Sequence, residues 1–191
     1  MEKLILASAS PRRRELLGLI AEDFDVIPAK GEENADMSLF PADTVKALAK
    51  QKAEEVSKEF PDRIVIGADT MVFCEGKALG KPKDADDAER MLKLLSGRVH
   101  SVITAVAVAQ NGNSVKLFAE ETKVEFYPLS DDEIHGYTES GEPMDKAGAY
   151  GIQGKGALLV KGIEGDYYNV MGLPVGRLYR ELKSLNFQNP L

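Results

Sequence analysis

The sequence has little cysteine and no long apolar run. Its single cysteine, Cys74, cannot form an intramolecular disulfide, which is typical of a reducing compartment. No stretch approaches the roughly 20 apolar residues that a membrane-spanning helix needs. The apolar residues 4–6 are too few for the core of a signal peptide. We therefore expect a cytoplasmic protein with no membrane association.

Basic residues are also fewer than acidic residues. Lysine and arginine together number 24 against 31 aspartate and glutamate residues, which gives a formal net charge of -7. Domains that bind nucleic acid usually present a basic face, so this acidic total argues against a nucleic-acid partner. Local clusters of positive charge are more informative for the same reason.

Three common functional patterns are missing. The two histidines, His100 and His135, lack the acid, nucleophile or second ligand that a catalytic triad or a zinc site requires, so we interpret both as structural or surface residues. No GxxxxGK[ST] motif occurs, which excludes a Walker-type phosphate loop. At 191 residues the chain is long enough for a single domain, 1–191, with one core or with two lobes.

The first pattern that indicates a site surrounds Asp69. Residues 64–66 are β-branched, which favours a buried strand, and Asp69 follows them where open α/β sheets usually bind ligands. A second strand at residues 71–74 and a tight turn after it would place Thr70 across from Lys81. Asp69, Thr70 and Lys81 are therefore expected to lie together, although an acid beside a base can also be a plain surface ion pair.

A cluster of arginines marks the N-terminal region. A strand at residues 3–7 leads into a small-residue turn and a helix that begins after Ser10, which is a favourable N-cap. Arg12 and Arg13 lie in the first turn, where the helix dipole already presents positive charge. This arrangement costs stability unless an anion binds, so it indicates a phosphate site. The alternative is that the long arginines extend into solvent.

Lys52 has an unusual position on a predicted helix at residues 42–58. It lies in the middle of the apolar stripe, whereas Lys46 lies well off it. A lysine at a core-facing position either extends to the rim or meets an anion. The second interpretation predicts that Lys52 points at the same site as Asp69.

Two loop residues also have two interpretations each. Glu33, next to Glu32 in a polar loop, is either solvated or a ligand for Mg²⁺, which is typically held by one or two carboxylates plus the substrate. Gln153 lies in a glycine-rich loop whose backbone can approach a ligand or another strand closely. Its amide matches the O4 and N3–H edge of thymine or uracil, but a loop glutamine is more often solvated.

The other segments are predicted to be structural. They are an outer strand at 24–28, a capped helix at 84–97, a hairpin of strands 99–109 and 114–127 around an Asn-Gly turn, a helix opened by a capping box at 130–133, a strand at 158–160 and a final helix at 175–182.

Five segments, in order along the chain, resemble the Maf family of nucleoside triphosphate pyrophosphatases, once called septum formation inhibitors. They are LASASPRR at 6–13, IGADT at 66–70, LGKP at 79–82, LSGR at 95–98 and DKAGAYGIQ at 145–153. The resemblance implies an α/β fold of the Maf and inosine-triphosphatase type, with a long mixed sheet flanked by helices and two lobes around a central cleft. It also implies a divalent cation, Mg²⁺ or Mn²⁺, and a homodimer.

The resemblance also implies roles for particular residues. Asp69 would be the proton acceptor, and Ser8, Arg12, Glu33, Lys52 and Lys81 would surround the triphosphate and the metal. Arg12, Thr70 and Gln153 match the positions that distinguish the dTTP/UTP branch of the family. The acidic pair of the family often reads Asp-Glu, and here it reads Glu32-Glu33. The complete prediction is Asp69, Lys52 and Lys81 for catalysis, Ser8, Arg12, Arg13, Thr70 and Gln153 for substrate binding, and Glu33 and Asp69 for the metal.

The predicted reaction is hydrolysis of dTTP, UTP or modified pyrimidine triphosphates between the α and β phosphates. It requires an in-line water, a base and charge neutralisation on the phosphate oxygens. A second hypothesis is a nucleotide-binding regulator of septum formation or cell division that needs no turnover. A third, a nucleic-acid-binding module that uses Arg12 to Arg14, conflicts with the acidic net charge.

Overall fold

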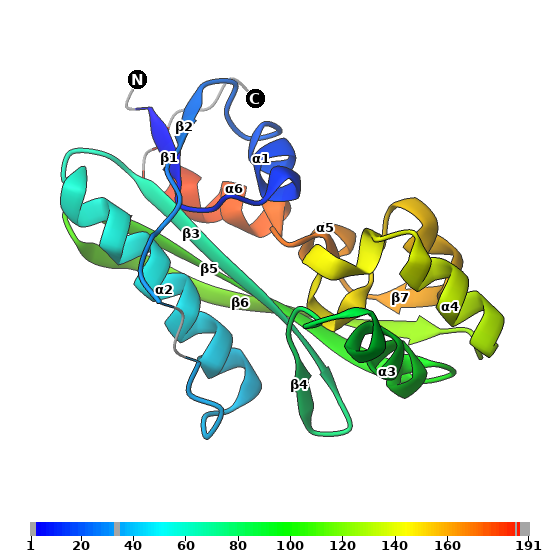
Figure 1. The fold of residues 1–191 in the computed structure, drawn as a ribbon. Helices are drawn as coiled ribbons and strands as arrows, with labels where there is room; N and C mark the ends of the chain where they lie inside the picture. The colour runs from blue at the N-terminus through cyan, green and yellow to red at the C-terminus, as the bar shows by residue number, and fades with distance from the viewer. Residues whose placement is uncertain (1–2, 33–34, 186, 188–191) are drawn as a thin grey trace. The chain divides into compact units, whose positions relative to one another are not determined.

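The computed structural model describes residues 3–32, 35–185 and 187 as an α/β fold (Figure 1). Its strands are β1 (Leu4–Leu6), β2 (Phe24–Val26), β3 (Val65–Cys74), β4 (Lys77–Leu79), β5 (Val99–Gln110), β6 (Asn113–Phe126) and β7 (Val160–Glu164). Its α-helices are α1 (Pro11–Leu17), α2 (Pro41–Glu59), α3 (Ala85–Leu95), α4 (Asp131–Glu139), α5 (Tyr167–Met171) and α6 (Val175–Ser184). Three short 3-10 helices are η1 (Glu142–Asp145), η2 (Ala147–Ala149) and η3 (Gly154–Leu158).

The seven strands of the described residues form one mixed sheet. The strand order is β2-β1-β3-β5-β6-β7, and β4 pairs with β3. β1 is parallel to both β2 and β3, whereas β4 and β7 are antiparallel to their neighbours. The prediction of a mixed sheet flanked by helices is therefore confirmed.

The chain divides into two compact units, and each is described by itself. The first unit comprises residues 1–69, 104–120 and 172–191, and the second comprises residues 70–103 and 121–171. β3, β5 and β6 contribute residues to both units.

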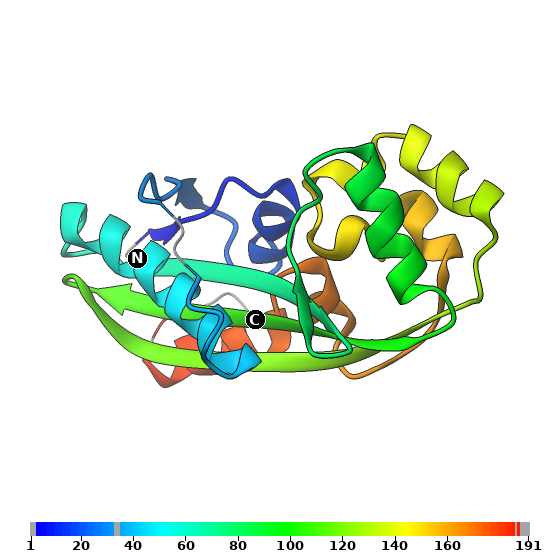
Figure 2. The same ribbon diagram turned by 60° about the horizontal axis from the view of Figure 1, so that its bottom comes forward.

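In the first unit, α2 packs closely on β3, beside which it lies in Figures 1 and 2. Gly67 makes this approach possible: a Cβ there would be 2.6 Å from the carbonyl oxygen of Ala49 and 2.7 Å from the nitrogen of Ala53. Any larger residue would push the helix off the strand. The glycine therefore sets the distance between Lys52, on this face of α2, and Asp69, two residues further along β3.

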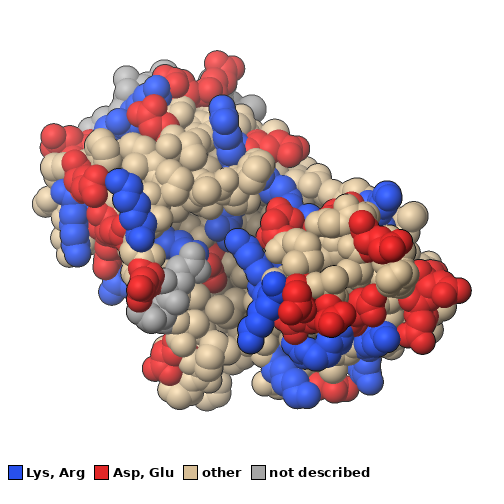
Figure 3. Space-filling view, in the orientation of Figure 1, with Lys and Arg blue, Asp and Glu red and all other residues tan. Residues whose placement is uncertain are grey.

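The second unit has its own core around α3, α4 and the strands under them. Phe126, Leu92 and Ile134 are among its most buried side chains. Acidic side chains gather on the surface over α4 (Figure 3). Among the acids of this unit, Asp84 caps α3 by accepting a hydrogen bond from the nitrogen of Asp87, and Glu133 completes the capping box of α4, so these two have structural roles as predicted.

Several local predictions are confirmed. Ser10 caps α1 through a hydrogen bond from the nitrogen of Arg13, and Ser130 forms the predicted capping box at the start of α4. Asn111 and Gly112 both have positive φ, 51° and 73°, in the turn between β5 and β6.

Two strand predictions are wrong in detail. β3 continues without a break from Val65 to Cys74, where the sequence analysis expected two strands separated at residues 67–70. Gly67 accommodates α2 rather than ends the strand. At the other position, the chain forms η3 up to Leu158, and β7 begins only at Val160.

In the described part of the chain, no helix combines the length and the apolar character needed to cross a membrane.

Candidate functional site

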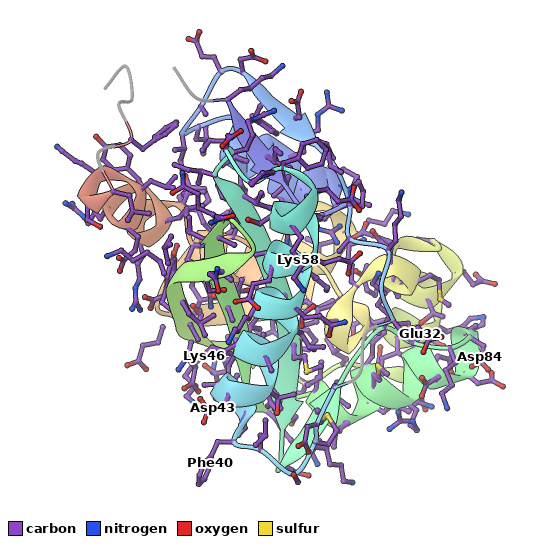
Figure 4. The ribbon with its side chains drawn as sticks, turned by 90° about the vertical axis from the view of Figure 1, so that its left-hand side faces the viewer. Glu32, Phe40, Asp43, Lys46, Lys58 and Asp84 are labelled. Carbon is purple, nitrogen blue, oxygen red and sulfur yellow. The ribbon has the colours of Figure 1, made fainter. Side chains whose placement is uncertain are left out.

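The first unit contains a largely buried ion pair between two predicted catalytic residues. Nζ of Lys52 lies 2.6 Å from Oδ1 of Asp69, with 14% and 10% of the two side chains exposed. The prediction that Lys52 points at Asp69 is confirmed. Lys46, by contrast, pairs with Asp43 on the exposed side of the helix, near the end where α2 begins (Figure 4).

A buried lysine and carboxylate at hydrogen-bond distance differ in character from a surface ion pair. Removal of both charges from water is costly, so such pairs persist where the geometry is good and where a function needs them. The position of Asp69 within a strand, rather than on a loop, gives its carboxylate a well-defined orientation.

Arg13 of the arginine cluster makes three hydrogen bonds within the protein. The guanidinium group of Arg13 donates from Nε to the carbonyl oxygen of Gly172 at 2.9 Å. It also donates from Nη1 to Oγ of Ser8 at 3.1 Å and to the carbonyl oxygen of Ala68 at 2.9 Å. Arg13 thus connects the turn after β1 to the residue before Asp69. Its predicted role in substrate binding stays a prediction.

The other predicted residues of the first unit lie on the same turn and helix. Ser8 is buried, and its Oγ accepts hydrogen bonds from Arg13 and from the nitrogen of Ser10. Arg12 is half-buried in the first turn of α1, and Arg14 is exposed. The strand, the turn and the helix N-terminus that were predicted as an anion site are therefore present.

The second unit carries Thr70, Lys81 and Gln153. The hairpin of β3 and β4 pairs Val72 with Leu79, which is the alignment predicted from the turn. Thr70 is half-buried, and Lys81 and Gln153 are exposed. That Asp69 meets Thr70 and Lys81 stays a prediction.

The glycine-rich loop that carries Gln153 is joined to this hairpin. The nitrogen of Gly148 donates to the carbonyl oxygen of Gly80, the residue before Lys81, at 3.0 Å. Gly148 has φ 70°, and a Cβ there would lie 2.9 Å from a methyl group of Val72. The hydrogen bond and the close packing together hold the start of the loop against β3 and β4.

Sequence reasoning missed the side chains that hold this loop. Glu142 and Tyr137 hydrogen-bond to the loop backbone at Gly151, Lys155 and Gly156. A glutamate followed by proline carries no signal for such a role, because its partners are 13 and 14 residues further along the chain.

His100 is a core residue of the second unit. Its Nε2 lies 2.7 Å from the hydroxyl oxygen of Tyr150, and its ring packs edge-on against the ring of Phe126. Burial lowers its pKa to about 4. His135 is exposed between Glu89 and Glu139, and its hydrogen bond to Glu89 raises its pKa. The prediction of structural or surface roles for the two histidines agrees with both environments.

Asp69 is the predicted metal ligand that the structure describes. Glu33 lies outside the described residues. Among the described residues, no group of three or more His, Cys, Asp or Glu side chains could hold a metal ion. Asp69 supplies carboxylate oxygens, the donors that Mg²⁺ and Mn²⁺ prefer, and a magnesium ion in a phosphate enzyme needs only one or two such ligands besides the substrate. The described residues are compatible with that kind of site.

Solved structures with the same fold include two Ham1 proteins. The protein from Coxiella burnetii superposes with a TM-score of 0.56 over 96% of this chain and 100% of its own, at 16% identity. The Staphylococcus aureus Ham1 protein gives a TM-score of 0.53 over the same share of each chain, also at 16% identity. The chain therefore has a Ham1-like α/β fold.

Sequence comparison is more specific. The family described as Maf-like protein matches residues 3–185, and the chain belongs to this family. It is 54% identical to a dTTP/UTP pyrophosphatase of Bacillus velezensis, over 98% of both chains. It is 53% identical to a dTTP/UTP pyrophosphatase of Carboxydothermus hydrogenoformans, over 97% of this chain and 100% of the relative. The family resemblance found in the sequence is confirmed.

Proposed function

We propose that this protein is a nucleoside triphosphate pyrophosphatase that hydrolyses dTTP and UTP to the monophosphate and pyrophosphate. The structural observation that carries the proposal is the buried Lys52–Asp69 pair beside the strand, turn and helix N-terminus around Ser8. The full-length similarity to proteins named dTTP/UTP pyrophosphatase supports the substrate assignment. The proposed substrates include modified pyrimidine triphosphates that keep the O4 and N3–H edge of thymine and uracil.

In this reaction a water molecule attacks the α-phosphorus in line with the bridging oxygen to the β-phosphorus. The new P–O bond forms as the bridging P–O bond breaks, and pyrophosphate leaves with the bond electrons. Asp69 accepts the proton that the water gives up. The ammonium group of Lys52 keeps the carboxylate of Asp69 oriented and offsets the negative charge that develops.

The remaining residues bind and orient the substrate. Arg12 is a donor for phosphate oxygens, the start of α1 adds the positive end of the helix dipole, and Ser8 lies in the turn beside them. Lys81 offsets charge on the departing pyrophosphate. Thr70 and Gln153 recognise the base, with the Gln153 amide matched to the O4 and N3–H edge.

The proposed enzyme uses a divalent cation. Asp69, together with Glu33, would hold Mg²⁺ or Mn²⁺, and such an ion when bound supplies charge neutralisation at the phosphate oxygens. We further propose a cytoplasmic homodimer with no nucleic-acid or membrane partner. Removal of divalent ions with a chelator should abolish turnover, and added Mg²⁺ or Mn²⁺ should restore it.

A panel of nucleoside triphosphates tests the function. Pyrophosphate release is measured for each, with Asp69→Asn beside the unmodified protein and with Asp62→Asn, an exposed aspartate of the same unit, as the matched control. We expect turnover of dTTP and UTP that falls by about 10²–10⁴-fold in Asp69→Asn, the usual effect of losing a general base, and not in Asp62→Asn. Nucleotide binding without turnover of any triphosphate would instead favour the regulator of septum formation or cell division, an alternative that the names of the relatives do not favour.

A further inference from the structure

The carboxylate of Glu142 lies against the loop that carries Gln153. It accepts hydrogen bonds from the backbone nitrogen of Lys155 at 3.1 Å and from that of Gly156 at 3.2 Å. Burial acts to raise the pKa of Glu142, but the two backbone donors, the hydroxyl of Tyr137 and the charge of Lys146 together outweigh it, and the pKa lies below its usual value. The side chain therefore stays ionised and remains an acceptor near neutral pH.

Tyr137 adds a second contact to the same loop. Its hydroxyl donates to Oε1 of Glu142 at 3.1 Å and accepts from the backbone nitrogen of Gly151 at 3.2 Å. Burial raises the pKa of Tyr137, so the hydroxyl keeps the proton that it donates. Glu142 and Tyr137, which we call the loop clamp, thus bind three backbone amides.

The glycines of the loop fit the clamp. A Cβ on Gly156 would lie 2.2 Å from the carbonyl oxygen of Gly151 and 2.7 Å from the hydroxyl of Tyr137. A Cβ on Gly154, which has φ 64°, would lie 2.8 Å from Oε2 of Glu142. These two glycines therefore leave room for the side chains of Tyr137 and Glu142 to pack against the loop backbone.

We propose that the loop clamp positions Gln153 for recognition of the base, an inference that rests on the proposed function. The amides bound by Glu142 and Tyr137 belong to residues 151, 155 and 156, so they flank Gln153 on both sides, and its own side chain is exposed. A side chain discriminates between hydrogen-bonding edges only if its backbone is held in place before the ligand binds. Glu142 and Tyr137 are positioning residues and touch no substrate.

The test compares UTP with its N3-methyl analogue, which cannot donate a hydrogen bond from N3. Gln153→Ala should lower the ratio of kcat/KM for UTP to that for the analogue, because the amide partner is gone. Glu142→Ala should lower the same ratio by about tenfold, the worth of one to two hydrogen bonds, through a higher KM for UTP and with kcat within about twofold. Tyr137→Phe should act in the same direction.

Three further variants make the test specific. Glu142→Gln keeps one of the two acceptor oxygens, enough for Gly156 and Tyr137, which share Oε1, but not for Lys155, which donates to Oε2. Its loss of the ratio should therefore be smaller than that of Glu142→Ala. Glu164→Gln, at an exposed glutamate of the same unit, is the matched control and should leave it unchanged. In the double variant Glu142→Ala/Gln153→Ala, the ratio should fall no further than in Gln153→Ala, because the clamp acts through Gln153.

Other outcomes would overturn the proposal. Additive losses in the double variant, or a lower kcat with an unchanged ratio, would mean that Glu142 has only a general structural role. An unmodified protein that hydrolyses no triphosphate would remove the proposed function. The ratio of the affinities for UMP and for its N3-methyl analogue, measured in the same variants, would then test whether the loop clamp positions Gln153. Amide hydrogen exchange at Gly156 provides a separate check, because protection unchanged by Glu142→Ala contradicts the clamp under either result.

Discussion

Replacement of Arg13 by lysine should destabilise the protein while preserving its charge. The guanidinium group donates to Ser8, Ala68 and Gly172 at once, over distances of 2.9 to 3.1 Å. A lysine ammonium carries its three N–H donors on one nitrogen of a flexible stem, whereas these bonds leave from two nitrogens of the planar guanidinium. We therefore expect lysine to keep one of the three acceptors and to leave two without their donor.

The expected cost follows from those two lost bonds. A hydrogen bond from a charged donor contributes about 1.5–3 kcal/mol, and the half-buried position of Arg13 favours the lower end of that range. Arg13→Lys should therefore lower the free energy of unfolding by about 3 kcal/mol. Urea unfolding measures it, provided that the slope of the transition is unchanged.

Arg14→Lys is the control, because Arg14 is exposed in the same turn of α1. Its effect should stay within about 0.5 kcal/mol, as is usual for surface substitutions. Equal effects of the two replacements would show that the hydrogen bonds of Arg13 add nothing to stability. Arg13 would then not be a structural link between the turn and β3.

Two further predictions concern the second unit. Gly156→Ala should destabilise the protein by about 1–3 kcal/mol through overpacking, because its Cβ would meet the carbonyl of Gly151. Gly162→Ala is the control and should leave stability unchanged, because a Cβ there meets nothing within 4 Å. Equal unfolding midpoints of the two variants would contradict the predicted overpacking. His100 has its pKa lowered from 6.5 to about 4, so the unfolded state binds the proton more readily. Stability should be fully present above pH 6.5 and fall by about 3 kcal/mol as the pH drops to 4. Denaturant titrations across this range measure the loss, and a slope that His100→Gln leaves unchanged would assign it to other groups.

The parts of the fold that follow from local chemistry were predictable. Ser10 before a proline and three arginines marks the start of α1, and Asn111-Gly112 marks the turn of the long hairpin. The apolar stripe of α2 was sufficient to predict that Lys52 would face Asp69. In each case the signal lies within one helix or one turn.

The parts that depend on distant partners were not predictable. Arg13 finds acceptors 55 and 159 residues away, and no local pattern distinguishes it from Arg12 in this respect. Gly67 and Ala68 at the middle of β3 read as a strand end, but Gly67 instead leaves room for the close approach of α2. The role of Glu142 likewise becomes visible only when the loop has folded back onto it.

The most direct test of the proposed reaction is hydrolysis of UTP in ¹⁸O-labelled water, with the label located by mass spectrometry. Attack at the α-phosphorus places the label in UMP and leaves pyrophosphate unlabelled, and the account predicts this result for the unmodified protein with little label transfer in Asp69→Asn. Label in pyrophosphate or release of UDP and phosphate would show attack at another phosphorus, and equal turnover by Asp69→Asn would show that Asp69 is not the base.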